Sequence, residues 1–374
     1  MRVLIDYRPA LRQRSGVGEY THQLVKALLG TFPKAVLELT VFSSSWKDRL
    51  DIEQTDLAGV TAIDSRVPVR LLNMAWHRLG WPSAEGLTGC SFAVTHSLHP
   101  LILPSRAAAQ IITIHDLDFL SHPERTHAEI RRDYPPLVRD HAHRADRILV
   151  PSQFTAGEVT RQLGVAAEKI SVCSPGAPNW MPRAAPPTDG YVLFLGTLEP
   201  RKNVGALLDA YERLSLRRYP LPRLVLAGKA TDESRLWLER IARPPLDGAV
   251  RHIGYVEPAS RRELYEGARL LVQPSFEEGF GLPVLEAMTV GVPVVAANRG
   301  ALPEVVADAG MLVDPDKADE VAAGIDRMLT DEAYAATCAA KGVERARHYQ
   351  WGTTARRVYE AYQLAVEHRQ CASA

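Results

Sequence analysis

Cysteine is scarce in this sequence, and its spacing excludes the usual cysteine chemistry. The four residues Cys90, Cys173, Cys338 and Cys371 contain no CxxC pair and no metal-ligand spacing. A disulfide framework needs a denser and more regular set. We therefore expect four reduced cysteines that mostly serve packing, as in a cytosolic protein.

Long apolar runs are also missing. No stretch approaches the roughly 18 apolar residues that a membrane span requires. The first apolar run, Val3 to Ile5, is too short for a signal sequence and is followed at once by Asp6. The sequence therefore predicts a buried first strand and a cytoplasmic protein, with no segment that crosses a membrane.

Neither sign of charge is in excess. Forty-four Lys and Arg balance 44 Asp and Glu, which excludes the strong overall positive field that is typical of a nucleic-acid-binding protein. A composition of 46% hydrophobic and 24% charged residues is typical of a soluble globular protein. At 374 residues the chain is longer than one core usually serves, so two domains are expected.

Short runs rich in Val, Ile and Leu alternate with helical patterns along both halves of the chain. This alternation predicts an α/β protein with two doubly wound parallel sheets. The expected domains are 1–180 and 181–350, joined by a proline-rich hinge near Pro175, and a last helix in 351–374 packs back across the hinge. The expected strands are Val3–Asp6, Leu37–Phe42, Phe92–Thr95, Ile111–Ile114, Ile148–Val150, Ile170–Val172, Tyr191–Leu195, Leu224–Ala227, Val250–Ile253, Leu270–Val272, Pro293–Ala296 and Met311–Val313.

Two local signals mark helix starts. Ser260 and Glu263 have the spacing of a capping box, and Pro283 stands where the first turn of a helix tolerates proline. Two facing doubly wound domains bind ligands in a cleft beyond the carboxyl ends of their strands. Residues that follow strands are therefore the candidates for chemistry.

The most specific motif is the run Phe276–Glu286, which follows a predicted strand and leads into a predicted helix. Its glycines let the backbone approach a ligand closely, and the amides of Gly281 and Leu282 would face a phosphate at the positive end of the helix dipole. Glu278 and Glu286 could each accept two hydrogen bonds from sugar hydroxyls. Either acid alone could be a capping or surface residue, but the whole run favours a nucleotide-sugar site.

A second motif, Gly196–Asn203, follows the predicted strand Tyr191–Leu195. Arg201 can grip two oxygens of a diphosphate, and Lys202 can offset the growing charge of a leaving group. The alternative interpretation is a solvated pair of cations at a helix start.

In the first half, Gly16 and Gly18 follow the opening strand, as in a phosphate-binding turn. Thr21 stands where a complete dinucleotide fingerprint has its third glycine. His115 closes another strand and could bond a substrate hydroxyl or be a satisfied structural histidine. Asp116 and Asp118 could alternatively hold Mn or Mg with a diphosphate, a design that we rank lower because the second half already supplies cations.

Together these motifs resemble the retaining GT-B glycosyltransferases of family GT4, over nearly the whole chain. The likeness rests on Ser15–Gly18, His115–Asp116, Glu199–Asn203 and, above all, Glu278–Glu286. It implies a GT-B fold, no metal cofactor, and transfer from a nucleotide diphosphate sugar. One departure is Thr197, because many relatives have arginine directly after the glycine that ends this strand, and Arg201 would then bear more of the phosphate contacts.

The resemblance also implies a role for each residue that matches a motif. Glu286 would bind the ribose, Glu278 the transferred hexose, and Arg201 with Lys202 the diphosphate. His115 would face the donor sugar. The remaining donor-binding positions would be Gly16, Gly18, Gly279, Phe280, Gly281 and Leu282.

The residue sequences of the motifs are similar to those of bacterial mannosyl- and rhamnosyltransferases of surface polysaccharide synthesis. This makes GDP-mannose the favoured donor and a glycan or a polyprenyl-diphosphate-linked sugar the expected acceptor. A peripheral membrane contact would use a basic face, which could include Arg131, Arg132, Arg139, Arg144 and Arg147. The oligomeric state is left open.

Three other functions remain as alternatives. A nucleotide-sugar epimerase on the same fold would convert donor without acceptor, a nucleotide-dependent oxidoreductase is disfavoured by the missing third glycine, and a non-catalytic nucleotide-sugar sensor would not consume donor. For the transferase, we expect front-face attack by the acceptor, with a covalent route through Glu278 as the alternative.

Overall fold

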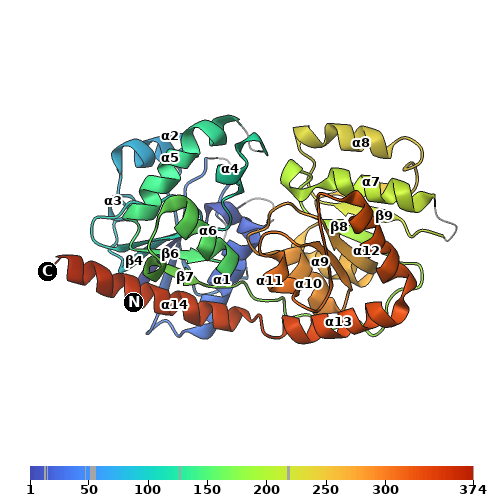
Figure 1. Cartoon of the computed structure of the whole chain (residues 1–374). Coiled ribbons are helices and arrows are strands. Elements are labelled where there is room, and N and C mark those ends of the chain that lie inside the picture. Colours follow the sequence, from blue (N-terminus) through green and yellow to red (C-terminus); the bar gives the residue numbers. More distant parts are fainter. Residues whose placement is uncertain are drawn as a thin grey trace. The chain divides into compact units, whose positions relative to one another are not determined.

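The computed structural model describes residues 1–11, 14, 16–46, 48–50, 56–125, 128–216 and 220–373, and for residues 128–133, 372 and 373 it describes the backbone alone. Ser15 and the side chains of Arg131 and Arg132 thus lie outside the described part. The chain divides into two compact units. Unit 1 comprises Met1–Gly176 and Gln350–Ala374, and unit 2 comprises Ala177–Tyr349 (Figure 1).

Unit 1 is built on a parallel sheet whose strand order, within the described residues, is β3-β2-β1-β4-β5-β6-β7. The order reverses beside β1, which pairs with β2 on one side and with β4 on the other. Its strands are β1 (Arg2–Asp6), β2 (Glu38–Ser43), β3 (Thr61–Asp64), β4 (Val94–Ser97), β5 (Ala109–Thr113), β6 (Arg147–Val150) and β7 (Ile170–Val172). Its helices are α1 (Val17–Thr31), α2 (Val69–Leu79), α3 (Ala84–Thr88), α4 (Asp118–Ser121), α5 (Ala128–Arg144), α6 (Gln153–Leu163), α14 (Trp351–Ser373) and the short 3-10 helices η1 (Arg8–Ala10), η2 (Pro123–Arg125) and η3 (Ala167–Lys169).

Unit 2 repeats this plan. Its parallel sheet has the order β10-β9-β8-β11-β12-β13 among the residues described, and the order reverses beside β8. Its strands are β8 (Tyr191–Leu195), β9 (Leu224–Ala227), β10 (Val250–Gly254), β11 (Ala268–Gln273), β12 (Val294–Ala297) and β13 (Met311–Val313). Its helices are α7 (Val204–Ser215), α8 (Arg235–Ile241), α9 (Pro258–Glu266), α10 (Leu282–Val290), α11 (Leu302–Val306), α12 (Ala318–Thr330), α13 (Glu332–Ala346) and the 3-10 helices η4 (Pro200–Lys202) and η5 (Asp232–Ser234).

The central strands are buried on both faces, which explains their unbroken apolar sequences. Each residue of β4, β5, β9 and β12 is buried. The expected fold class is confirmed, and each of the expected strands overlaps an observed one. The strand β3, which the sequence does not reveal, lies at the sheet edge and has no buried residue, so it lacks the apolar signal of the others.

The last helix, α14, completes the core of unit 1. Ala355, Val358 and Tyr362 are fully buried against residues of α1 and the sheet. The Tyr362 hydroxyl lies 2.8 Å from Nδ1 of His96, which is itself fully buried in β4. The chain therefore leaves unit 1, builds unit 2 and then returns to unit 1 (Figure 1).

Three local expectations can be compared with the structure. Pro283 lies in the first turn of α10, as predicted. The capping box at Ser260 is wrong, because α9 already begins at Pro258 and Ser260 lies inside its first turn. Arg147 does not belong to a basic helix face, because it lies in β6 and donates from Nε to Ser171 Oγ at 2.7 Å.

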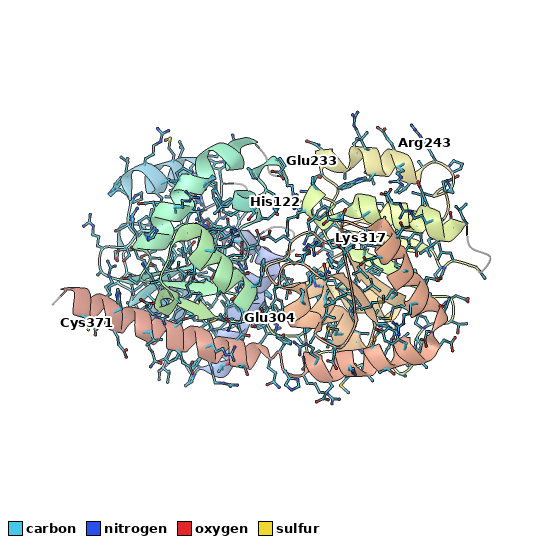
Figure 2. All side chains as sticks on the ribbon, in the orientation of Figure 1. His122, Glu233, Arg243, Glu304, Lys317 and Cys371 are labelled. Atoms are coloured by element: carbon cyan, nitrogen blue, oxygen red, sulfur yellow. The ribbon has the colours of Figure 1, made fainter. Side chains whose placement is uncertain are left out.

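All four cysteines are free, and Cys371, near the end of α14, is exposed (Figure 2). In the described part of the chain, no helix has both the length and the apolar character to pass through a bilayer.

Candidate functional site

The two second-half motifs lie in adjacent loops of unit 2. The strands β8 and β11 are neighbours, so the segments that follow them emerge at the same edge of the sheet. The backbone amide of Phe276 donates to the carbonyl of Arg201 at 2.8 Å and joins the two segments. Lys202 ends η4, and Glu278 lies between β11 and α10.

Lys202 and Glu278 form a buried ion pair. Lys202 Nζ lies 2.6 Å from Oε1 and 2.7 Å from Oε2 of Glu278, and the two residues are 8% and 6% exposed. Arg201 Nη1 lies 3.6 Å from Oε2, and Arg201 Nε lies 2.7 Å from an oxygen of Glu199. The structure thus brings together the three residues that the sequence singled out for the diphosphate and the hexose.

Two residues that sequence reasoning missed support the same carboxylate. Ser275 Oγ donates to Glu278 Oε1 at 2.8 Å, and Gln273 Nε2 donates to it at 3.1 Å. Burial alone would raise the pKa of Glu278, but the charges of Lys202 and Arg201 and the hydrogen bonds from Lys202 and Ser275 lower it below the ordinary value. The acid is therefore ionised at neutral pH, with Oε1 held by three donors.

Two glycines fix the backbone around Glu278. Gly281 has φ 106° and caps α10, a conformation that favours glycine. Gly300 has φ 60°, and a Cβ there would lie 2.7 Å from the carbonyl oxygen and 2.8 Å from the amide nitrogen of Glu278. Gly300 lies in the segment after β12 and was not predicted, although a glycine shortly after a strand is the kind of signal that could have revealed it.

The other predicted donor-binding positions in this segment differ in what they expose. The side chain of Phe280 is 6% exposed and packs edge to face on Tyr349, with ring centroids 5.5 Å apart. Its side chain belongs to the core of unit 2, so its backbone is the part that could contact a ligand. Gly279 precedes it in the loop, and Leu282 is the first residue of α10.

Glu286 has its own set of partners, on α9. The Tyr265 hydroxyl donates to Oε2 at 2.8 Å, and Arg261 Nη1 lies 3.5 Å from Oε1. Burial and the charge of Glu286 raise the pKa of Tyr265 well above its ordinary value, so Tyr265 remains a hydrogen-bond donor. Arg261 and Tyr265 are one helical turn apart and are the buried residues of α9.

In unit 1, Gly16 and Gly18 lie where α1 begins. Gly16 has φ 48° and precedes the helix, and a Cβ on Gly18 would lie 2.6 Å from the carbonyl oxygen of Pro9. Gly18 therefore allows the close approach of α1 to η1, and Gly16 supplies the positive φ before the helix. No third glycine is required for that contact.

His115, which follows β5, contacts the same helix. Its ring packs edge to face on Tyr20 of α1, with centroids 5.0 Å apart, and Nε2 lies 3.1 Å from the carbonyl oxygen of Leu98. Burial lowers the pKa of His115 to about 4, so the ring is neutral at pH 7. With Nε2 donating to that carbonyl, Nδ1 is the acceptor.

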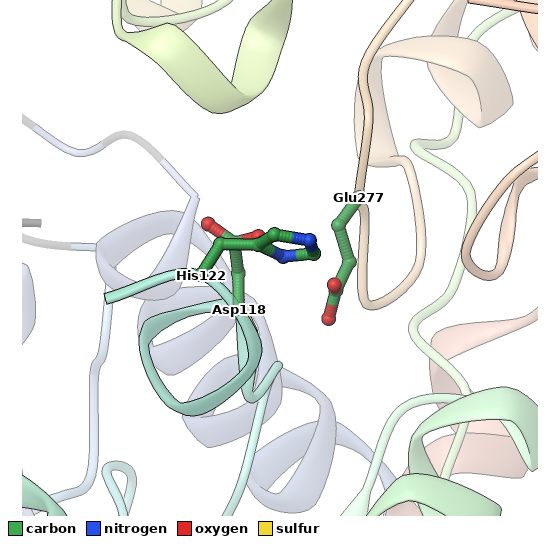
Figure 3. A group of neighbouring side chains, drawn as sticks. All are labelled: Asp118, His122 and Glu277. Carbon is green, nitrogen blue, oxygen red and sulfur yellow. The ribbon is translucent and has the colours of Figure 1, made fainter. Parts of the chain in front are cut away.

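The aspartates that follow His115 have partners within unit 1. Asp118 Oδ1 lies 3.1 Å from His122 Nδ1 and 3.4 Å from Arg125 Nη1, and Asp116 Oδ1 accepts from the Asp118 amide at 3.4 Å. Figure 3 shows His122 against Asp118; Glu277, also drawn there, belongs to unit 2. A guanidinium beside Asp118 makes the pair of Asp116 and Asp118 less suited to binding a divalent cation.

Comparison with known proteins adds to these observations. Residues 14–178 match the model of Glycosyltransferase Family 4, and residues 180–345 match that of Glycosyl transferases group 1. The O-antigen chain mannosyltransferase B of Escherichia coli is 31% identical over 390 residues, which cover 97% of this chain and 100% of that protein. The phosphatidyl-myo-inositol mannosyltransferase of Mycolicibacterium smegmatis is 34% identical over 189 residues, 48% of each protein.

A solved structure shows the same fold. The sucrose-phosphate synthase of Thermosynechococcus elongatus aligns with a TM-score of 0.77 at 21% identity, covering 97% of this chain and 98% of that one. The two doubly wound units thus form a GT-B fold. With both halves matched to one family and a relative aligned from end to end, the chain belongs to the group 1 glycosyltransferases of family GT4.

Proposed function

We propose that this glycosyltransferase moves mannose from GDP-mannose, with retention of the anomeric configuration, to a hydroxyl of a glycan or a polyprenyl-diphosphate-linked sugar. The observation that carries the site assignment is the buried Lys202–Glu278 pair, with Arg201 beside it, at the carboxyl edge of the unit 2 sheet. It places two cations and an ionised carboxylate within one small region. Those are the groups that a diphosphate and a hexose require.

The donor is held in three parts. Arg201 and Lys202 bind the diphosphate, and the amides at the start of α10 add the positive end of a helix dipole. Glu278 accepts hydrogen bonds from the hexose, and Glu286 accepts them from the ribose. His115, neutral at pH 7, accepts a hydrogen bond from a sugar hydroxyl through Nδ1.

The reaction is a front-face displacement. The bond between C1 of the hexose and the diphosphate oxygen breaks, and its electron pair leaves with the diphosphate. The acceptor oxygen bonds to C1 from the same face, and its proton passes to the departing diphosphate oxygen. Lys202 and Arg201 stabilise the charge on that oxygen.

Glu278 is a hydrogen-bond acceptor in this scheme, and not a nucleophile. Three donors already hold its Oε1, and Lys202 and Arg201 lie close to Oε2. Such contacts stabilise the carboxylate and reduce its nucleophilicity. They support the front-face route over a covalent glycosyl-enzyme.

Mannose is favoured because two relatives are named as mannosyltransferases although their acceptors differ. One of them, the O-antigen chain enzyme, aligns over 97% of this chain. The other acts on phosphatidyl-myo-inositol, as its name states. Surface polysaccharide synthesis is the process that the first relative supports, and no metal is needed because cationic side chains face the phosphates.

The test incubates the full chain with GDP-mannose, with and without a mannose-terminated lipid-linked acceptor, and with and without chelator. We expect GDP release that requires acceptor, an α-linked product by NMR, and no loss with chelator. Donor turnover without acceptor would indicate an epimerase, and stoichiometric binding without turnover would indicate a sensor. Activity that chelator abolishes and manganese restores would overturn metal independence. A thermal-shift panel of nucleotide sugars identifies the donor, since a ligand stabilises the state that binds it.

A further inference from the structure

Gln273, the last residue of β11, is a polar side chain that an apolar strand buries completely. Leu271 and Val272, which precede it, and Gln273 itself are all 0% exposed. On the side of β12, Gln273 lies opposite Ala296. A buried carboxamide has lost its hydrogen bonds to water, so its presence in this core requires partners within the protein.

The contacts of Gln273 fix the direction of its carboxamide. Nε2 donates to Ser275 Oγ at 3.0 Å and to Glu278 Oε1 at 3.1 Å. The Ser275 hydroxyl donates to the same carboxylate oxygen at 2.8 Å, so it can only accept from Gln273. A reversed amide would place its oxygen against the carboxylate with no proton between them. The donor end of Gln273 therefore faces Glu278.

The acceptor end of the same carboxamide is not satisfied. Gln273 Oε1 is buried and has no hydrogen-bond partner within the described part of the chain. A buried acceptor without a partner costs free energy, and methionine, a side chain of similar length, would not incur this cost. Packing alone therefore does not account for Gln273, whereas its donor end joins the set of groups around Glu278.

The two carboxylate oxygens of Glu278 have different surroundings. Oε1 accepts from Gln273 and Ser275, which are both 0% exposed, and from Lys202. Oε2 has Lys202 Nζ at 2.7 Å and Arg201 Nη1 at 3.6 Å, and both cations belong to η4. Neutral donors inside the core thus anchor one oxygen, and the other oxygen faces the cations.

We propose that Gln273 and Ser275 are positioning residues that hold Oε1 of Glu278, so that Oε2 stays directed at the transferred hexose. A bound diphosphate would share Lys202 and Arg201 with Glu278, and the two cations would then hold the carboxylate less firmly. Gln273 and Ser275 are too deeply buried for a ligand to draw them away. This inference rests on the proposed function, because it assumes that Glu278 meets the sugar.

The first test measures steady-state kinetics of Gln273→Met and Ser275→Ala with GDP-mannose and acceptor. We expect each variant to lower kcat about tenfold, the usual scale for one hydrogen bond to a charged group, and to change the donor KM less than about twofold. The direction of Oε2 matters most in the transition state, whereas the phosphate and ribose contacts that bind the donor are unchanged.

A double-variant cycle shows whether Gln273 acts through Glu278. In the Glu278→Gln background, Gln273→Met should lower kcat less than about twofold, because the carboxylate that it positions is already gone. An equal loss of about tenfold in both backgrounds would overturn the proposal, since Gln273 would then support the fold and not Glu278.

Thermal melts test the same role without any sugar. Gln273→Met should leave Tm close to that of the parent protein, because the unpaired Oε1 is removed together with the lost hydrogen bond. In the Lys202→Met background it should lower Tm by about 5 °C, because Glu278 then depends more on its neutral donors. Equal Tm changes in the two backgrounds would contradict the positioning role. A parent protein that transfers no sugar would contradict the proposed function instead, and the melts would still decide this inference.

The matched control is Gln110→Met in β5 of unit 1. Gln110 is also a buried glutamine on a strand, 9% exposed, and its Nε2 donates to the carbonyl of Leu103 at 3.3 Å. The control should keep the parental kcat, and a tenfold loss there would overturn the assignment to Glu278. If Gln273→Met folds poorly, Ser275→Ala completes both cycles, because it removes the other neutral donor to the same oxygen.

Discussion

Lys202 Nζ lies within hydrogen-bond distance of both carboxylate oxygens of Glu278, at 2.6 Å and 2.7 Å. Each residue therefore compensates the buried charge of the other. A bound diphosphate would share the Lys202 ammonium with Glu278. Substitution of either residue must then change both stability and catalysis.

Lys202→Met should lower the stability of unit 2. It leaves the Glu278 carboxylate buried without its main partner, which costs about 3 to 5 kcal/mol, or about 10 °C in Tm for a unit of this size. Lys202→Met with Glu278→Gln should regain most of that loss, because the charge is then removed as well. Calorimetry of Lys202→Met, Glu278→Gln and the double variant measures the coupling, and additive losses would contradict it.

The control for this cycle is an exposed ion pair in the same unit. Lys341 Nζ lies 2.8 Å from Asp308, and both side chains are about half exposed or more. Solvent screens such a pair. Lys341→Met should leave Tm essentially unchanged.

Glu278→Gln should keep the fold but reduce turnover by about 10²- to 10³-fold, the usual loss when a charged contact to the reacting sugar is removed. Steady-state kinetics with GDP-mannose and acceptor measure it. Glu278→Ala with added azide tests the covalent route. Recovery of turnover, with release of mannosyl azide of inverted configuration, would show that Glu278 is the nucleophile and would replace the front-face scheme.

Tyr265→Phe should raise the donor KM about fivefold with little change in kcat. The variant removes the hydroxyl that donates to Glu286 Oε2, a bond with a net contribution of about 1 kcal/mol. Tyr211→Phe is the matched control, because its hydroxyl donates to the carbonyl of Pro222 at 3.1 Å and no proposed donor contact depends on it. A similar KM change in both variants would indicate a general loss of packing.

The sequence allowed the sheets to be predicted because their central strands are apolar without interruption. The carboxyl-edge motifs could be found for a related reason, since a strand followed by glycines and charged residues is visible in one dimension. Lys202, Arg201 and Glu278 were each predicted, and the structure shows that they meet. Ser275 and Gln273 could not be distinguished from ordinary polar residues at a strand end.

Contacts between distant segments were the part that remained hidden. Gly300 follows a different strand from Glu278, and both its positive φ and the close approach of the two backbones, which leaves no room for a side chain, are visible only in the folded chain. Tyr265 looks like a core tyrosine in a helix, and its bond to Glu286 depends on how α9 packs on α10. The edge strand β3 was hidden because exposed positions give no apolar pattern.

Gly18→Ala should destabilise unit 1, while Gly30→Ala should not. The new methyl group at position 18 would lie 2.6 Å from the backbone oxygen of Pro9, so α1 or η1 must shift. The equivalent methyl at position 30, in the same helix, meets nothing within 4 Å and should add up to about 1 kcal/mol through helix propensity. Thermal melts of both variants test the contrast, and equal Tm values would refute it.

Stability should fall as the pH drops below about 6.5. Burial lowers the pKa of His96 to about 3, so the folded state resists a proton that the unfolded chain takes up at its ordinary pKa of 6.5. The stabilisation is full above pH 6.5 and is lost as the pH falls towards the folded pKa, at about 1.4 kcal/mol per pH unit. His115 and His141 act in the same direction.

His96→Asn isolates this contribution. The variant should be less stable at pH 7 because the contacts with Tyr362 and Thr113 are lost. Its Tm should nevertheless fall less steeply between pH 6.5 and 5 than that of the parent protein, because one buried titrating group is gone. Parallel curves for the two proteins would rule out His96 as a source of the acid sensitivity.

The return of α14 to unit 1 sets an order for folding during synthesis. Ala355, Val358, Ala361, Tyr362 and Ala365 belong to the core of unit 1, yet the ribosome makes them after every residue of unit 2. Unit 2 can therefore complete its fold first. Unit 1, although its synthesis starts earlier, cannot complete its core until α14 has been made. A nascent chain arrested before residue 350 should present a protease-resistant unit 2 and a unit 1 with the α14-facing side of its core still open to water.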